Sequence, residues 1–376
     1  MENRVTQRLA NARERALSEL KARGASRQKT LAENVRSVGV RGLVSGAVAS
    51  ARELLRAPDS NGRAAASPPP PPPPPQPILV DPITDHPIMR SESPSSFLWL
   101  DVEGYEAEID RKRAAGLIDR QEAVLLREWA VNGYLVLRQC IPLELTERSL
   151  ADVDAVWSER KHVQIDVLTD GRRAHVDEVD ASVRSAPHKL NDLYLTSDAA
   201  RQIFLHERIV RMVGLILGDE VVGCNSLTFE FGSQQPPHID HVYMTPPAPR
   251  RLVASWIALE DVRPESGPLA LWPGSHRLRP FDFGGTYHYL PALEPQHTRY
   301  VAEQAPRFPE MQYLAKRGDV LLWHALLVHG GSAIANPGRT RKSMACHYFA
   351  RRDVGPAPHA PFGLAWYLEK PVAHSE

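Results

Sequence analysis

The chain has 376 residues, of which 43% are hydrophobic, and its 45 Lys and Arg balance 45 Asp and Glu. This length and apolar content suit a sizeable globular enzyme. Three scattered cysteines, Cys140, Cys224 and Cys346, argue against a disulfide framework and favour a reducing compartment. No apolar run reaches the roughly 18 residues of a membrane span, and no signal-peptide core is present. We therefore expect a cytoplasmic protein without a transmembrane segment.

The first 66 residues differ in composition from the rest and carry thirteen Lys and Arg against six Asp and Glu. Apolar residues recur at helical spacing over residues 3–22, which predicts a weakly amphipathic helix. Such a basic extension could dock a partner protein, bind an anionic surface or serve as a transit peptide, although its acidic residues weaken the last reading. We favour a solvated, partly disordered or helical extension.

Residues 67–94 form a proline-rich linker, with eight consecutive prolines at Pro68–Pro75. Polyproline II geometry makes this run a rod of roughly 25 Å. A spacer is the favoured role, and an SH3- or WW-type ligand is the alternative. A protein partner is therefore expected, if at all, through the extension or this run.

The globular part is expected at residues 95–376 and begins with helical patterns. Residues 101–131 show helical periodicity, residues 133–138 predict a strand, and Thr146 is the candidate N-cap of the next helix. Ser197 is expected to open one further helix that Gly218 ends.

The pattern then changes to short strand-like runs broken by Pro and Gly. Helices followed by strands predict an α+β fold around a β-sandwich or jelly roll. Residues 281–315 are polar, aromatic and proline-rich, and we expect them to form a long loop that serves as a lid. The catalytic part has no groove rich in Lys and Arg with interleaved aromatic residues, so no nucleic-acid partner is expected.

Two histidines and one aspartate are the candidate metal ligands. In PPHIDHVYM, His238 and Asp240 share one face of an extended chain, while Ile239 points away. A second histidine, His329, lies 91 positions later, directly before Gly-Gly. Two imidazoles and a carboxylate make the facial triad of non-haem Fe(II) sites. His324 competes with His329 for this role, but the two face opposite sides of one strand, and we favour His329.

A cation follows the second histidine. Arg341 comes twelve residues after His329, at the start of the next strand-like run. A guanidinium binds a carboxylate through two parallel hydrogen bonds, so Arg341 suits an anionic co-substrate. Arg339 is its rival for this role.

These residues resemble a known family. The blocks HIDH, ASWIALEDVRPESGPLALWPGSH and GDVLLWHALLVHGGSAIANPGRTRKSMACHYF are similar to the phytanoyl-CoA dioxygenase family of Fe(II)- and 2-oxoglutarate-dependent oxygenases, over roughly residues 120–350. The resemblance implies a double-stranded β-helix core, jelly-roll or cupin-like, with flanking helices. It implies iron at the triad of His238, Asp240 and His329. Around the 2-oxoglutarate it places Arg341 on the distal carboxylate, Trp256 in the pocket lining, and Lys189 and Asn191 as candidate polar contacts.

The resemblance also implies a reaction. The enzyme would use Fe(II), 2-oxoglutarate and O2, with ascorbate as a possible aid, and would release succinate and CO2 while hydroxylating a small-molecule substrate. Related halogenases replace the aspartate with a small residue, so Asp240 favours hydroxylation or desaturation. Three departures stand out. Ile239 replaces a frequent Gln, and Ser332 is displaced by one position. The loop before Arg341 is one residue longer, which makes Arg339 a rival, but the block that follows Arg341 matches the family directly. The alternative is a non-catalytic jelly-roll binding protein of the same fold.

Overall fold

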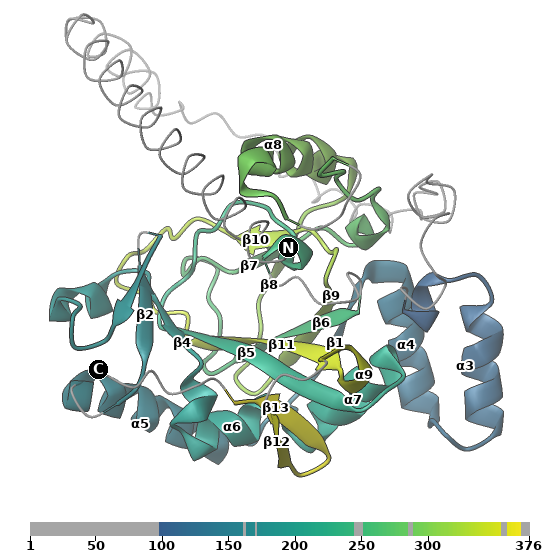
Figure 1. Cartoon of the computed structure of the whole chain (residues 1–376), viewed down its shortest axis with the longest axis horizontal. Helices are drawn as coiled ribbons and strands as arrows, with labels where there is room; N and C mark the ends of the chain where they lie inside the picture. Colours follow the sequence, from purple (N-terminus) through teal and green to yellow (C-terminus); the bar gives the residue numbers. More distant parts are fainter. Residues whose placement is uncertain are drawn as a thin grey trace, which may run out of the picture. The chain divides into compact units, whose positions relative to one another are not determined.

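The computed structural model describes residues 98–160, 163–169, 171–243, 251–284, 289–354 and 359–369, all within the unit Pro73–Glu376. The predictions for residues 1–66 and 67–94 lie outside these ranges. Figure 1 shows helices α5, α6 and α7 on one side of a large sheet, and a small sheet with helix α8 on the other. None of the helices in the described ranges has the length and apolar character of a membrane span.

The chain first builds a helical pair and one strand. A reciprocal capping box starts α4 (Arg120–Asn132): Asp119 accepts a hydrogen bond from the backbone N–H of Glu122, and the Glu122 side chain accepts one from that of Asp119. Gly133 ends the helix in the left-handed conformation, with φ of 76°. A Cβ there would lie 2.4 Å from Nδ1 of His276, so only glycine fits. The strand predicted at residues 133–138 follows as β1 (Tyr134–Leu137).

Two helix predictions need correction. The helix expected from Thr146 is α5 (Leu143–Glu159), which begins directly after Pro142 because proline, lacking an N–H, suits a helix start. The single helix expected between Ser197 and Gly218 is two helices. Ser197 caps the first and Gly218 ends the second, as predicted, but His206 is extended and accepts a hydrogen bond from the N–H of Arg208, which interrupts the helix. The helices of the described residues are α3 (Tyr105–Ala114), α4, α5, α6 (Asp198–Phe204), α7 (Glu207–Leu217), α8 (Glu294–Gln304) and α9 (Arg351–Val354), with several short 3-10 turns.

A ten-stranded sheet forms the platform of the fold. Its main path runs β1-β9-β6-β11-β5-β4-β2-β3, and every pairing is antiparallel except that of β13 with β5. Its strands are β1, β2 (Asp166–Thr169), β3 (Arg172–His175), β4 (Lys189–Asn191), β5 (Val221–Phe229), β6 (Leu252–Ala258), β9 (Val320–His324), β11 (Ser343–Ala350), β12 (His359–Phe362) and β13 (Ala365–Leu368).

A three-stranded antiparallel sheet lies over this platform. It consists of β7 (Leu269–Leu271), β8 (Met311–Tyr313) and β10 (His329–Gly331), in the order β10-β7-β8. The single strand expected to carry both His324 and His329 is therefore two strands in two different sheets. The chain turns between them, where the N–H of Leu327 donates to the carbonyl of His324.

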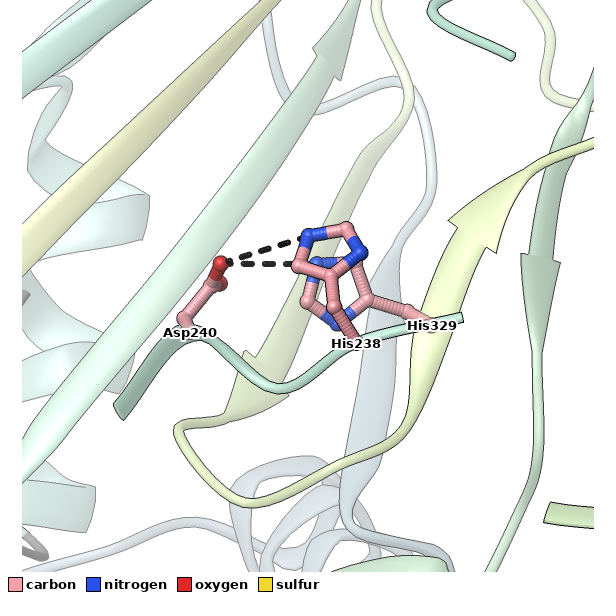
Figure 2. Close-up of side chains that lie close together, drawn as sticks. All are labelled: His238, Asp240 and His329. Carbon is pink, nitrogen blue, oxygen red and sulfur yellow. Dashed lines mark ion pairs between the residues drawn. The ribbon is translucent and has the colours of Figure 1, made fainter. Parts of the chain in front are cut away.

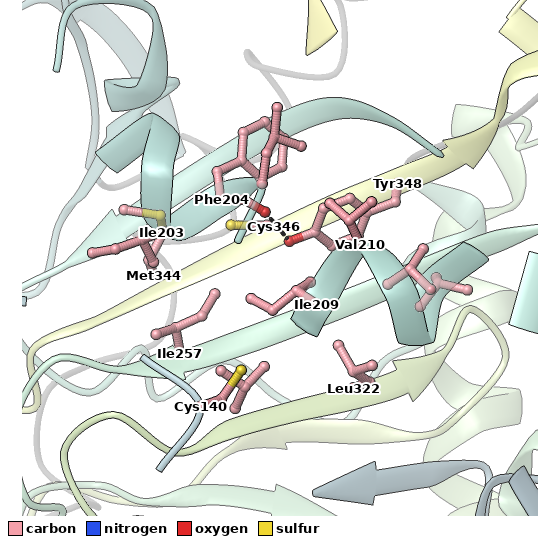
Figure 3. Packing of buried hydrophobic residues seen from close by; sticks show 14 of the residues in the cluster. Cys140, Ile203, Phe204, Ile209, Val210, Ile257, Leu322, Met344, Cys346 and Tyr348 are labelled. Atoms are coloured by element: carbon pink, nitrogen blue, oxygen red, sulfur yellow. Dashed lines mark hydrogen bonds between the residues drawn. The ribbon is translucent and has the colours of Figure 1, made fainter. Parts of the chain in front are cut away.

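The alternation of side chains along the large sheet separates two buried layers. In β9, Val320 and Leu322 belong to the core beneath the sheet, whereas Leu321 and Trp323 face the small sheet. The other central strands alternate in the same way. Figure 3 shows the helix-side core, to which both Ile209 and Leu322 belong and where the Tyr348 hydroxyl donates to the Phe204 carbonyl. The opposite, inner face of the sheet is therefore the one available for a site.

Residues 281–315 are not the long loop that the sequence predicts. They contain α8 and β8, and α8 contributes Val301 to a third buried cluster together with Ile239, Trp272 and Phe283. Ile239 thus packs under this segment, because its side chain points to the side opposite His238 and Asp240. Within this segment, α8 lies on the outer side of the small sheet (Figure 1), and β8 is one of the strands of that sheet.

The architecture is therefore a mixed α/β fold built on antiparallel sheets. Its sequence-level prediction as an α+β fold agrees with this arrangement.

Candidate metal centre

His238 and His329 lie side by side although 91 residues separate them. His329 is the first residue of β10, and His238 pairs with it as an isolated antiparallel bridge at the edge of the small sheet. The imidazole centroids are 4.3 Å apart. The strand segment that carries His238 thus extends the small sheet by one residue pair.

Both histidines present the same nitrogen to the site. Nδ1 of His238 lies 2.8 Å from the carbonyl oxygen of Pro236, and Nδ1 of His329 lies 3.0 Å from that of Leu327. A carbonyl only accepts, so each Nδ1 carries a proton and each Nε2 is the nitrogen turned to the site. Burial by itself would lower the pKa of His329, but the neighbouring Asp240 outweighs burial and raises it. Burial lowers the pKa of His238 to about 3, with His329 as the next cause. The neutral form with a free Nε2 is the form that binds a metal.

Asp240, two residues after His238, is the third member of the cluster. Ile239 is extended, and Asp240 begins a 3-10 turn, η7 (Asp240–Val242), so the expected same-face arrangement holds although no named strand contains it. Oδ1 of Asp240 lies 3.8 Å from Nε2 of His238 and 3.5 Å from Nε2 of His329. Figure 2 shows the three side chains converging. The three ligand atoms lie within 4.8 Å of one another, and all three residues are buried.

The neighbouring histidines stabilise the negative charge of Asp240. Burial by itself would raise the pKa of this carboxyl, but His329 and then His347 outweigh burial and hold the pKa well below its ordinary value. An ionised carboxylate oxygen beside two imidazole nitrogens is a donor set that suits a divalent first-row transition metal.

His324 does not join this cluster. It ends β9 on the face opposite Trp323, where Nε2 lies 3.0 Å from Oδ2 of Asp101 and Nδ1 accepts from the N–H of Leu326. The structure thus brings His329, and not His324, to Asp240. His241 is also buried, and its backbone N–H donates to the carbonyl of Ala325.

Arg341 is buried on the inner face of the large sheet, only 1% exposed. Its Nη1 atom donates to the carbonyl of Gly267, and its guanidinium lies 5.4 Å from the ring of Trp256 and 5.7 Å from that of Phe229. Nε has no hydrogen-bond partner among the described residues, and burial lowers the pKa of Arg341 to about 10. Its rival Arg339 is exposed, 3.7 Å from Glu265.

A buried guanidinium with an unpaired N–H suits an anionic ligand, because an unpaired buried charge costs several kcal/mol. Trp256 lies against Arg341, and its own indole N–H has no partner among the described residues. The co-substrate roles that the family resemblance implies for Arg341 and Trp256 stay predictions.

Lys189 approaches the cluster from β4. It pairs in register with Phe229 of β5, lies 5.6 Å above that ring and donates to Oε1 of Gln235. Burial lowers the pKa of Lys189, while the charge of Asp240 acts in the opposite direction. Its neighbour Asn191 hydrogen-bonds Asp192 and Asn225 instead of facing the cavity beside Lys189.

A cavity of about 570 Å³ opens beside Lys189 and Phe229. Ligand pockets commonly have volumes of roughly 300–1,000 Å³. Arg172, Arg173 and His188 also line it, and no Asp or Glu is among its described lining residues. Arg173 forms an ion pair with Asp166. Arg172 and Lys189 form no ion pair with a described carboxylate, and Lys189 hydrogen-bonds Gln235 instead. These two side chains therefore make the cavity positively charged.

Two residues that contact the cluster are missing from the sequence-based predictions. The indole N–H of Trp323 donates to Oδ2 of Asp240 over 2.8 Å, and Nε2 of His347 lies 3.5 Å from the same oxygen. Alternation along their strands is the signal that could have found them. Trp323 is an inner-face position of β9, and His347 is one of β11.

The fold and the site define a mixed α/β protein with antiparallel sheets and a buried cluster of two histidines and one aspartate. The family model described as phytanoyl-CoA dioxygenase matches residues 129–343, which is more than half of the chain. The chain therefore belongs to the phytanoyl-CoA dioxygenase family, a family of dioxygenases.

Individual relatives are distant. The chain is 23% identical over 231 residues to the peroxisomal phytanoyl-CoA dioxygenase of Mus musculus, covering 58% of this chain and 65% of that protein. It is 24% identical over 288 residues to that of Rattus norvegicus, covering 71% and 76%. A solved structure of the epimerase SnoN in complex with Fe3+, alpha ketoglutarate and nogalamycin RO aligns with a TM-score of 0.48 and 18% identity, over 66% of this chain and 98% of that one. The chain thus spans about two thirds of the length of the first of these relatives.

Proposed function

We propose that this protein is an Fe(II)- and 2-oxoglutarate-dependent dioxygenase that hydroxylates a small molecule and releases succinate and CO2. The observation that carries the proposal is the pairing of the cluster His238, Asp240 and His329 with the buried, incompletely bonded Arg341. We further propose that the two facing sheets are the double-stranded β-helix of this enzyme class, within a dioxygenase domain at residues 95–376.

The residues fit the two groups that this reaction needs. His238 and His329 would hold Fe(II) through Nε2 and Asp240 through Oδ1, leaving the remaining coordination positions for 2-oxoglutarate and O2. Bound there, the iron would supply the oxidising chemistry that couples 2-oxoglutarate decarboxylation to hydroxylation. Every other task falls to the chain itself.

Arg341 would bind the distal carboxylate of 2-oxoglutarate through its guanidinium, of which the Nε–H is unpaired among the described residues. The desolvated guanidinium makes this ion pair strong, and the rings of Trp256 and Phe229 hold the guanidinium in place. Lys189 would contribute a second cation at the edge of the same pocket.

The substrate would enter through the cavity beside Lys189. Its volume suits a small molecule, and Arg172 and Lys189 would favour a substrate with an anionic group. The retained Asp240 occupies the position that a halide would need, so hydroxylation or desaturation is the expected outcome.

Anaerobic titration tests the proposal. Fe(II)-loaded protein titrated with 2-oxoglutarate should develop the visible charge-transfer band, and with O2 and ascorbate it should form succinate. Asp240→Ala should abolish both signals. A band without succinate from any substrate would instead identify the alternative, a non-catalytic binding protein of the same fold, whereas wild-type turnover by Asp240→Ala would refute the site.

The functions of the remaining parts stay predictions. Deletion of residues 1–76 should leave succinate formation unchanged if the extension and linker serve only location or a protein partner. Fluorescence microscopy of the tagged full-length chain would test the cytoplasmic location.

A further inference from the structure

The two carboxylate oxygens of Asp240 face different surroundings. Oδ1 is the oxygen nearest Nε2 of His238 and of His329, at 3.8 and 3.5 Å. Oδ2 faces the large sheet, where it accepts the indole N–H of Trp323 over 2.8 Å and lies 3.5 Å from Nε2 of His347. One oxygen is thus turned to the cluster, and the other is already bonded.

Trp323 contacts two members of the cluster at once. Its N–H holds Asp240, and its ring lies 4.9 Å, centroid to centroid, from that of His329. The side chain is 2% exposed and belongs to the layer between the sheets, next to Leu321 on β9. Close packing leaves the indole little freedom, so its N–H has a fixed direction.

A network of buried polar side chains contacts His347 on the side away from Asp240. Nδ1 of His347 lies 3.3 Å from Oδ1 of Asn225. The amide nitrogen of Asn225 donates to Asn191 over 3.2 Å and to Asp192 over 2.9 Å, which fixes the amide so that Oδ1 points at His347. Asp192 itself is held by the backbone N–H of Ser226. The imidazole is therefore oriented by the sheet and not by Asp240 alone.

We propose that Trp323, backed by His347 and Asn225, is a positioning residue that occupies Oδ2 of Asp240 and so limits the aspartate to one metal-binding oxygen. The proposal rests on the proposed iron site. A carboxylate can bind a cation through one or both oxygens. With Oδ2 engaged, only Oδ1 is free to bind, and the position that a second oxygen would fill stays open for the co-substrate.

The arrangement also stabilises metal binding itself. Hydrogen bonds to the outer atoms of ligands fix their orientation, and their loss typically costs about 10–100-fold in metal affinity. Trp323→Phe removes the N–H while keeping an aromatic ring against His329. Trp129→Phe is the matched control, because Trp129 is fully buried and its N–H has no partner among the described residues.

The experiment measures Co(II) binding to the full-length protein by anaerobic calorimetry, together with the visible spectrum of the Co(II) form. Trp323→Phe should bind Co(II) about 10–100-fold more weakly than wild type, with an altered spectrum from a changed carboxylate mode. Trp129→Phe should match wild type in both. A smaller loss is expected for His347→Gln, which serves if Trp323→Phe fails to fold.

The controls separate this proposal from the proposed function. Asp240→Ala should lose Co(II) binding. If it does, and both Trp323→Phe and His347→Gln keep wild-type affinity and spectrum, the positioning role is refuted while the metal site stands. If Asp240→Ala itself binds Co(II) as wild type does, the proposed iron site and the positioning role both fail.

Discussion

His238 and His329 are joined main chain to main chain. The N–H of His238 donates to the carbonyl of His329 over 2.9 Å, and the N–H of His329 donates back to His238 over 3.0 Å. This reciprocal pair sets the spacing of the two imidazoles directly through the backbone. The rigidity of the candidate metal centre therefore depends on the contact between β10 and the segment that precedes His238.

A first prediction concerns the glycines after His329. A Cβ on Gly330 would lie 2.9 Å from the carbonyl oxygen of Gln235 and 3.3 Å from the carbonyl carbon of Pro236. These are backbone atoms, so Gly330→Ala should push the two segments apart and move His238 away from His329. We expect Fe(II) affinity to fall about tenfold or more, by analogy with the loss of other ligand-orienting contacts.

Anaerobic metal titration measures this effect. Gly338→Ala is the control. Gly338 lies on an exposed turn, and the atom nearest to its new Cβ, Oδ1 of Asn336, would be 3.4 Å away, which is an ordinary contact. Equal Fe(II) affinity of Gly330→Ala and wild type would contradict the role of this backbone pairing.

A second prediction separates the two candidate arginines. Arg341→Gln should raise the KM for 2-oxoglutarate about thirtyfold or more, because losing a buried partner of a charged group costs about 2 kcal/mol or more. Arg339→Gln should leave KM near its wild-type value, since Arg339 is exposed and faces Glu265. Succinate formation at varied 2-oxoglutarate concentrations measures both, and a larger effect at Arg339 would reverse the assignment.

A third prediction concerns acid stability. Burial, followed by the neighbouring His324, lowers the pKa of His276 to about 3, and Asp101 and Arg277 are the other charges that act on it. In the unfolded chain this histidine titrates near its ordinary pKa of about 6.5. Below that pH the unfolded chain takes up a proton on this histidine and the folded protein does not. The contribution of neutral His276 to the free energy of unfolding is therefore complete above about pH 6.5, and it decreases as the pH falls towards 3.

The difference between wild type and His276→Gln isolates this effect. Between about pH 6.5 and about pH 5 the unfolding free energy of wild type should fall by about 2 kcal/mol more than that of the variant. Urea unfolding followed by circular dichroism at both pH values gives the two slopes. Identical slopes would show that His276 takes up its proton in the folded protein.

A fourth prediction separates stability from the site. Ile209 is fully buried in the core beneath the large sheet (Figure 3), away from the inner face. Ile209→Ala should lower the unfolding free energy by about 2–5 kcal/mol, yet the folded variant should bind 2-oxoglutarate as wild type does. Val124→Ala, at a half-exposed position, should change stability by less than about 0.5 kcal/mol. A weakened 2-oxoglutarate complex in folded Ile209→Ala would show coupling across the sheet.

Local signals were sufficient for much of this chain. Ser197 as a cap, Gly218 as a helix end and the strand around Val136 follow from short-range chemistry, and the structure contains all three. The helix break at His206 and the division of 320–331 between two sheets were not predictable in this way. Both depend on which distant segment packs against the chain at that point.

The sequence by itself determined the chemistry that is present: two histidines and an aspartate at spacings that bring them to one cluster, and an arginine just before the start of a neighbouring strand. Only the tertiary structure decided that the sheet turns His324 towards Asp101 and that Trp323 bonds the second oxygen of Asp240, with His347 beside it. The physical reason is the alternation of side chains along each strand. It assigns neighbouring residues to opposite faces, but the face that becomes the site is set by the second sheet that packs upon it.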